Sequence, residues 1–161
     1  MLQIFHAPRT RSFRVLWLAE EIGLPYEIKR ETLGKPSAEL LAANPSRKLP
    51  AIRDGKTAMS ESTAIMHYLT QKYGPPPLAL TPAQDRYADY LQFLILGEAS
   101  MAAQLNLVMR TLFMTPHDQK QNFTVDATKT IFRLRLKDVE AQLNKGEYMA
   151  GEFSAADISV G

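Results

Sequence analysis

Three consecutive prolines at positions 75–77 separate two parts of the sequence that have different hydrophobic patterns. A proline lacks a backbone amide and clashes with the preceding helical turn, so this run cannot lie inside a helix and makes a stiff spacer. Before the prolines, strand-like and helix-like segments alternate; after them, the pattern is helical only. We therefore predict an α/β domain at residues 1–74, a linker at 75–81 and an all-α domain at 82–161.

The first domain begins with a strand, a helix and a second strand. Residues 2–5 form a short apolar run and residues 26–30 alternate, which is typical of strands. Between them, apolar residues recur at the spacing of one helix face, and this order favours a parallel strand pair with a crossover. Asp54-Gly55 predicts a hairpin turn. Helices are expected at 37–43 and 62–73.

The second domain is predicted to consist of helices with polar residues at their starts. Thr81 and Gln84 fit a capping box with a proline at the first helical position, and a helix is expected from there to about Phe113. Pro116 marks a break in the helical pattern. A second long helix is expected at about 118–144.

The end of the sequence carries a further helix start. Ser154 and Asp157 have the spacing of a capping box, in which each side chain accepts from the backbone amide of the other residue. Fewer than two helical turns separate this start from Gly161. We therefore expect the natural chain to be truncated here and the helical domain to be incomplete.

Composition restricts the classes of function. The net charge of +2 is too small to indicate nucleic-acid binding. No stretch approaches the roughly 20 apolar residues of a membrane span, and the N-terminus lacks a secretion signal, so a cytoplasmic protein without a membrane partner is expected. Residues 1–80 contain 11 Lys and Arg against 7 Asp and Glu. This basic excess suits a small anionic ligand, although a chance excess of surface lysines would look the same.

Two absences narrow the chemistry further. The sequence contains no cysteine, so a protein-thiol nucleophile, a disulfide and a thiolate metal site are all excluded for these residues. The three histidines, His6, His67 and His117, are scattered and do not have metal-ligand spacing, so no metal is predicted. His6 follows the first strand and could line a pocket or serve as a hydrogen-bonded structural residue.

Four segments together resemble the glutathione S-transferase superfamily, in its bacterial serine/threonine type rather than its tyrosine or cysteine types. They occur in the order and spacing of that family, at residues 11–26, 44–52, 59–69 and 154–157. The resemblance implies a thioredoxin-like N-terminal domain that binds glutathione, followed by an incomplete all-α domain. It also implies glutathione as co-substrate and a homodimer.

The resemblance implies a binding site for the backbone and charged ends of glutathione. Pro50 would be the cis-proline that presents the backbone of Leu49 to the cysteinyl part of the ligand; an ordinary trans proline at a strand edge is the alternative. Arg47 and Lys48 would bind the glycine carboxylate, or would simply be a solvated basic pair.

The γ-glutamyl end of glutathione would lie at the helix that begins near Ser62. A helix N-terminus offers free amides and a positive dipole end, which suit a carboxylate. Ser62 would add a hydroxyl donor and Glu61 would pair with the ammonium group, although Ser62 could instead only cap its helix.

The reaction requires a glutathione thiolate, and a free thiol has a pKa of about 8.5. A hydroxyl or amide donor near a helix N-terminus lowers that value. The resemblance places the donor about four residues before the helix arginine, which indicates Thr10; Ser12 and the amide of Arg11 are the alternatives. Thr10 and Ser12 could also act only as caps of the first helix.

The sequence thus predicts a glutathione transferase that conjugates the glutathione thiolate to small apolar electrophiles. Two other functions stay open at this point. One is a non-catalytic binding or regulatory protein on the same fold. The other is a glutathione-dependent peroxidase or disulfide reductase, although the absence of cysteine argues against a redox mechanism that uses a protein thiol.

Overall fold

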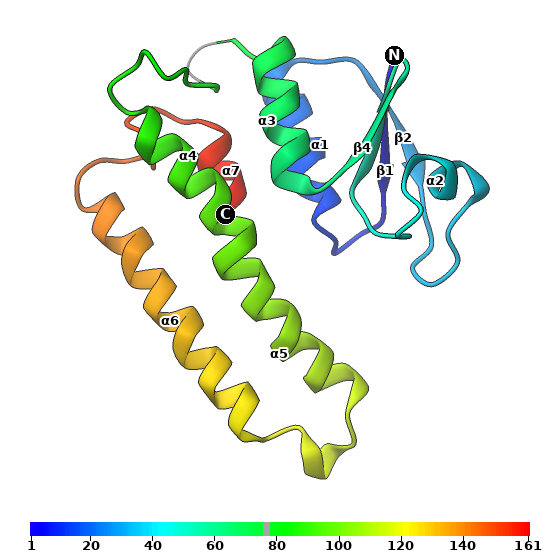
Figure 1. Cartoon of the computed structure of the whole chain (residues 1–161), viewed down its shortest axis with the longest axis vertical. Helices are drawn as coiled ribbons and strands as arrows, with labels where there is room; N and C mark the ends of the chain where they lie inside the picture. Colours follow the sequence, from blue (N-terminus) through cyan, green and yellow to red (C-terminus); the bar gives the residue numbers. More distant parts are fainter. Residues whose placement is uncertain (76–77) are drawn as a thin grey trace. The chain divides into compact units, whose positions relative to one another are not determined.

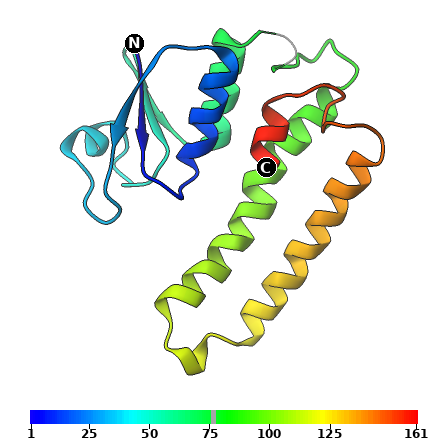
Figure 2. The same ribbon diagram turned by 180° about the vertical axis from the view of Figure 1, so that it is seen from behind.

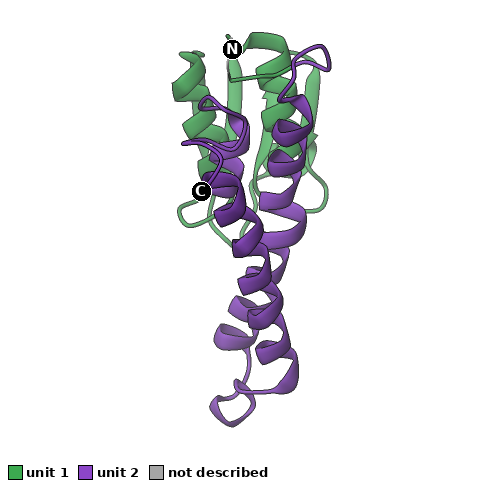
Figure 3. Ribbon diagram, turned by 90° about the vertical axis from the view of Figure 1, so that its left-hand side faces the viewer, with its two compact units in different colours: residues 1–80 green, residues 81–161 purple. Residues whose placement is uncertain are grey.

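The structure, a computed structural model, describes residues 1–75 and 78–161. Its backbone divides into two compact units, Met1–Leu80 and Thr81–Gly161, coloured separately in Figure 3. Part of the predicted linker at 75–81, residues 76–77, lies outside the described residues. Each unit is described by itself below.

Unit 1 contains a four-stranded mixed sheet with strand order β2-β1-β3-β4. Strands β1 and β2 pair in parallel, as the crossover pattern predicted, whereas β1 with β3 and β3 with β4 pair antiparallel. The elements are β1 Leu2–His6, α1 Ser12–Ile22, β2 Tyr26–Arg30, α2 Ala38–Ala43, β3 Ala51–Asp54, β4 Thr57–Ser60 and α3 Ser62–Tyr73.

Helices cover both faces of this sheet. Figures 1 and 2 show α1 and α3 together on one face and α2 on the other. Because side chains alternate along a strand, the paired residues Ile4 and Ile52 lie on one face, while the paired residues Phe5 and Ala51 lie on the opposite face. Phe5 and Ala51 pack with α2 through Leu40. This arrangement is the predicted thioredoxin-like α/β fold.

The β3–β4 hairpin is tied to α3 through Asp54. The Asp54 carboxylate accepts hydrogen bonds from Tyr68 Oη at 2.8 Å, Lys72 Nζ at 2.8 Å and Tyr73 Oη at 2.9 Å. Partial burial acts to raise the pKa of Asp54, but the hydrogen bonds from Lys72, Tyr68 and Tyr73 outweigh it and hold the pKa below its ordinary value of 3.8. The ionised carboxylate is therefore the form that stabilises the fold.

We expect Asp54→Asn to lower the free energy of unfolding by about 1–2 kcal/mol at pH 7, because the hydrogen bonds lose their charged acceptor. A carboxyl whose folded pKa is lowered contributes stability above its unfolded pKa and loses it as the pH falls through the folded value. Urea unfolding from pH 7 into acid should therefore show a difference at pH 7 that shrinks as the pH falls below the ordinary value of 3.8 and vanishes below the folded-state pKa of Asp54. Asparagine keeps the turn preference of Asp54-Gly55, so an undiminished difference in acid would contradict this account.

Unit 2 is all-helical. Its elements are α4 Tyr87–Leu96, the π-helical turn η1 Gly97–Ala102, α5 Ala103–Met114, the short 3₁₀ turn η2 His117–Gln119, α6 Phe123–Leu143 and α7 Ala155–Val160. Helices α5 and α6 lie side by side, and α7 packs against α4 (Figures 1 and 2). The predicted helical class is confirmed.

Two predicted helix starts in unit 2 are wrong by a few residues. The Thr81 amide does donate to Gln84 Oε1 at 2.7 Å, but that contact closes a turn and the helix begins only at Tyr87. The second helix begins at Phe123 rather than near 118, because the Asn122 side chain accepts from the Val125 amide and so caps it there.

The helical run Tyr87–Met114 is more apolar than expected, since no stretch of the sequence was expected to resemble a membrane span. Its 28 residues, with a mean hydropathy of 1.3 over the most apolar window, meet the length and composition of a membrane span. A core helix of a soluble protein meets the same criterion, and this run packs against α6 and α7. Length and composition alone therefore do not assign it to a membrane.

The predicted capping box at α7 is confirmed. The Ser154 side chain accepts from the Ala156 amide, while Asp157 Oδ2 accepts from the Ser154 amide at 2.9 Å. Asp157 Oδ1 also accepts from the Met149 amide at 2.8 Å, which ties the preceding loop to the same carboxylate. These bonds satisfy backbone donors that a helix start would otherwise leave without partners.

Candidate functional site

The sheet register brings the predicted site segments to one end of unit 1. Phe5 near the end of β1 pairs with Ala51 at the start of β3, and Ala51 pairs with Ser60 at the end of β4. The segments that adjoin these three residues therefore emerge from the same edge of the sheet. They are residues 7–12, 47–50 and 61–62, which contain every site residue predicted from the sequence.

The segment before β3 contains two unusual backbone features, a cis peptide bond and a residue with a positive φ angle. The Leu49–Pro50 peptide bond is cis, as predicted, while Arg47 (φ 64°) and Lys48 are exposed. Buried Asn44 holds this loop: its Nδ2 donates to Lys48 O at 2.9 Å. The sequence indicated Asn44 only as the start of the segment 44–52, so its role in holding the loop was missed.

The segment after β4 combines a strained residue with a helix N-terminus. Glu61 is exposed and has φ 76° and ψ 110°, an unusual conformation for a residue with a side chain. Such a conformation costs of the order of 1–3 kcal/mol and is concentrated at functional sites. Ser62, which is 2% exposed, is the first residue of the 12-residue helix α3. The N-cap position belongs to Glu61, so Ser62 is not the cap of this helix.

The segment after β1 contains the three candidates for the thiol donor. Thr10 is half-buried, and its Oγ1 donates to Ala7 O at 2.8 Å. Ser12 is fully buried, and its Oγ lies 2.6 Å from Thr10 Oγ1. Arg11 occupies the N-cap position of α1, and no side-chain cap bond forms there. Thr10 therefore keeps part of its surface exposed, whereas Ser12 has none exposed.

His6 joins the same group of side chains, and the sequence did not indicate its partner. His6 Nδ1 lies 2.8 Å from Ser12 Oγ. Burial lowers the pKa of His6, and the positive charge of Arg30 lowers it further, so the ring is neutral near pH 7. A histidine at a strand end six residues before a serine was the only available signal.

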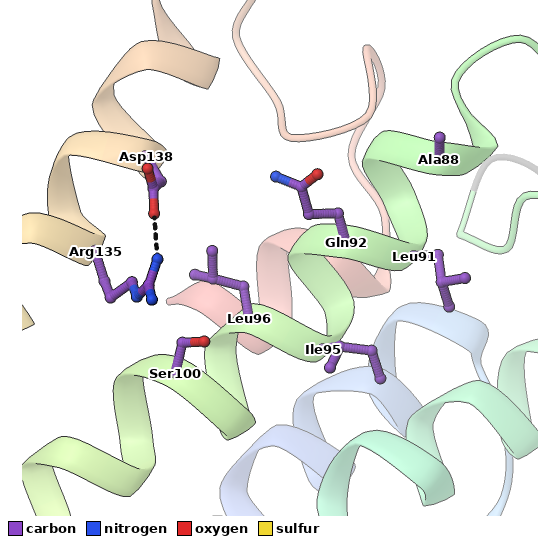
Figure 4. Close-up of a pocket in the computed structure, with 8 residues that line it drawn as sticks. All are labelled: Ala88, Leu91, Gln92, Ile95, Leu96, Ser100, Arg135 and Asp138. Atoms are coloured by element: carbon purple, nitrogen blue, oxygen red, sulfur yellow. Dashed lines mark hydrogen bonds and ion pairs between the residues drawn. The ribbon is translucent and has the colours of Figure 1, made fainter.

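Unit 2 contains a separate groove of about 640 Å³ between α4 and α6 (Figure 4). An ion pair between Arg135 and Asp138, with a separation of 3.3 Å, lines one side, and apolar residues such as Leu96 line the other. None of the predicted site residues lies in this groove. Within residues 1–75 and 78–161, no group of three or more His, Cys, Asp or Glu side chains could hold a metal ion.

Sequence comparisons connect the chain to proteins of one kind. The family described as "Glutathione S-transferase, N-terminal domain" matches residues 5–77. Glutathione S-transferase 1 of Zea mays is 33% identical over 150 residues, which cover 87% of this chain and 68% of that protein. A probable glutathione S-transferase of Oryza sativa subsp. japonica is 30% identical over 178 residues, which cover 95% of this chain and 74% of that protein.

Solved structures show the same likeness along nearly the whole chain. A glutathione transferase from Pseudomonas putida, with one glutathione disulfide bound per subunit, has a TM-score of 0.85 at 25% identity and covers 99% of this chain. A glutathione S-transferase from Bombyx mori, also with a TM-score of 0.85, is 26% identical. This chain covers 72% and 74% of those two chains.

Proposed function

This chain belongs to the glutathione S-transferase family, and on that basis we propose that it binds glutathione at the edge formed by residues 7–12, 47–50 and 61–62. The reaction proposed is attack of the glutathione thiolate on a small apolar electrophile. The observation that carries this proposal is the sheet register, which brings a cis-proline segment, a helix N-terminus and the half-buried Thr10 to one edge.

The charged ends of glutathione match the chemistry of two of the segments. The γ-glutamyl carboxylate would accept from the first amides of α3 and from the Ser62 hydroxyl, and Glu61 would pair with the ammonium group. The strain at Glu61 supports a ligand role, since it holds the exposed side chain beside the helix start. Arg47 and Lys48, both exposed, would bind the glycine carboxylate, while the Leu49 backbone would bind the cysteinyl part.

The thiol would be ionised by Thr10. A hydroxyl that donates to sulfur favours the charged form and so lowers the thiol pKa, and the nearby N-terminus of α1 acts in the same direction. The thiolate is the nucleophile, so a lower pKa gives more reactive glutathione at neutral pH. Holding the two reactants side by side would supply the rest of the rate gain.

The proposal is tested by retention of the protein on immobilised glutathione, followed by a conjugation assay with a chloro-nitroaromatic electrophile. We expect retention, elution by free glutathione, and release of chloride at a rate above the uncatalysed reaction. Failure to be retained would refute the glutathione site. Retention without turnover would refute the transferase and favour a binding protein. A homodimer and a cytoplasmic location are also proposed, and light scattering tests the first.

We expect Ser62→Ala to raise the glutathione Kd about tenfold, because a hydrogen bond to a charged carboxylate is lost. Thr57→Ala is the matched control, since Thr57 is exposed and lies at the other end of β4 from Ser62. Isothermal titration of both variants checks the prediction. Equal affinities for the two variants would place the γ-glutamyl end elsewhere.

A further inference from the structure

Four polar atoms form a continuous chain at the end of β1. His6 Nδ1 lies 2.8 Å from Ser12 Oγ, Ser12 Oγ lies 2.6 Å from Thr10 Oγ1, and Thr10 Oγ1 lies 2.8 Å from Ala7 O. All three separations are within the range of good hydrogen bonds. Each contact therefore needs one proton, and the protons come from two hydroxyls and one imidazole ring.

With one proton in each of the three short contacts the chain has a single direction, and the longer 3.5 Å contact between Ser12 Oγ and Ala7 O is left without a proton. The carbonyl of Ala7 can only accept, so the Thr10 hydroxyl must donate to it. The contact between Thr10 and Ser12 then requires the Ser12 proton. The proton in the contact between Ser12 and His6 must then come from the imidazole ring, so His6 must carry a proton on Nδ1. The chain thus runs from His6 through Ser12 and Thr10 to Ala7.

We propose that His6 is a positioning residue whose Nδ1–H sets the direction of the Ser12 and Thr10 hydroxyls and so leaves the Thr10 proton available to glutathione sulfur. This inference rests on the proposed function. When the thiolate binds, the Thr10 hydroxyl turns from the Ala7 carbonyl to the sulfur. The bonds from His6 to Ser12 and from Ser12 to Thr10 stay as they are, and they polarise the terminal donor.

The other neutral tautomer of His6 would remove that donor. With the proton on Nε2, Nδ1 accepts and the Ser12 proton turns toward the ring. The Thr10 proton must then fill the 2.6 Å contact with Ser12, because two oxygens at that distance repel one another without a proton between them. The Ser12 proton is then directed at the ring and does not replace that of Thr10 as a donor to the ligand. The tautomer of His6 therefore decides whether the site has a hydroxyl donor for sulfur.

The surroundings of His6 disfavour the doubly protonated, charged ring, so the two neutral tautomers are the forms to compare. Burial and the positive charge of Arg30 both lower the pKa of His6, so the ring carries one proton at neutral pH. His6 and Arg30 are paired across the parallel strands β1 and β2. Ser12 Oγ, 2.8 Å from Nδ1, can either accept from Nδ1–H or donate to an unprotonated Nδ1, so both tautomers are compatible with this contact taken alone.

The first test uses the wild-type protein without glutathione. Nitrogen-15 NMR of the imidazole ring distinguishes a protonated from an unprotonated Nδ1. We expect the Nδ1–H tautomer of His6 at neutral pH. The Nε2–H tautomer would overturn the inference whatever the outcome of the glutathione-binding assay, so the two proposals fail separately.

The second test compares two variants of His6 in the full chain. His6→Phe removes the donor, whereas His6→Asn keeps an amide N–H close to the position of Nδ1. We expect His6→Phe to reduce kcat/KM about tenfold and to raise the pKa of bound glutathione, read from the ultraviolet absorbance of the thiolate, while the glutathione Kd stays within about twofold. His6→Asn should recover most of the loss.

Three results would contradict the positioning role. One is an unchanged thiol pKa in His6→Phe, and another is an equal loss in His6→Asn, which would indicate packing rather than donation. The third is a loss confined to the glutathione Kd, which would indicate a binding contact. His117→Phe, at an exposed histidine in unit 2, controls for the substitution itself.

Discussion

Thr10→Val should reduce kcat/KM for glutathione conjugation about 100-fold, the typical cost of removing one donor that stabilises a reacting anion. Valine keeps the shape of threonine and removes only the hydroxyl. Thr10 is half-buried, and its hydroxyl is the last donor of the hydrogen-bond chain that begins at His6. The pKa of bound glutathione should rise toward the ordinary thiol value of about 8.5. The loss of kcat/KM should therefore be largest below pH 7 and should shrink as the pH rises above the thiol pKa of about 8.5.

Three controls separate the hydroxyl from its surroundings. Thr10→Ser keeps the donor and should retain most of the activity. Ser12→Ala breaks the chain at a fully buried position without removing the terminal donor, so its loss should be smaller than that of Thr10→Val. The glutathione Kd should be almost unchanged in Thr10→Val. A Thr10→Val protein with the wild-type pH–rate profile would show that Thr10 does not ionise the thiol and would leave Ser12 and the Arg11 amide as the candidate donors.

Gly97→Ala should lower the free energy of unfolding of unit 2 by about 3 kcal/mol or more, as expected for a clash with backbone in a packed core. A Cβ at Gly97 would lie 2.1 Å from Ser159 O and 2.5 Å from Ser159 C, both backbone atoms of α7. The same approach allows Ser159 Oγ to donate to Leu94 O at 2.7 Å. Alanine would therefore force α7 away from α4 and break this buried bond.

The sign of this effect distinguishes packing from helix propensity. Gly97 lies within a helical run, where alanine is intrinsically better than glycine by about 1 kcal/mol. Gly146→Ala is the matched control, since a Cβ there meets nothing within 4 Å. Urea and thermal unfolding should show a large loss for Gly97→Ala and a change of less than about 0.5 kcal/mol for Gly146→Ala. A stabilised Gly97→Ala protein would mean that α7 does not pack against α4 as described.

Local sequence signals predicted the elements of unit 1 and several of their ends. The Asp54-Gly55 turn in unit 1 and the capping box at Ser154 and Asp157 in unit 2 each depend on residues close together in the chain. The helix starts in unit 2 were less predictable. Thr81 and Gln84 have the same spacing as the capping box at Ser154 and Asp157. Their contact closes a turn, however, and the helix begins only at Tyr87.

The residue types of the candidate site were also readable from the sequence, but their arrangement was not. The motif at 44–52 indicated a cis-proline, which the structure contains. No spacing rule indicated that Ser12 is buried, that Glu61 is strained, or that His6 and Ser12 are in contact. Those features depend on the turn between β1 and α1 and on the strands packed beside it.

The sequence by itself determined the class of each unit, because hydrophobic period, turn residues and caps are properties of short segments. Tertiary structure alone decided which segments meet. The pairing of Phe5 with Ala51, and of Ala51 with Ser60, brings three distant segments to one edge of the sheet. The sequence likewise did not predict that α7 packs against Gly97, since a glycine in a helix does not specify which segment lies close to it. Contacts between residues far apart in the chain depend on register and packing, which no local pattern encodes.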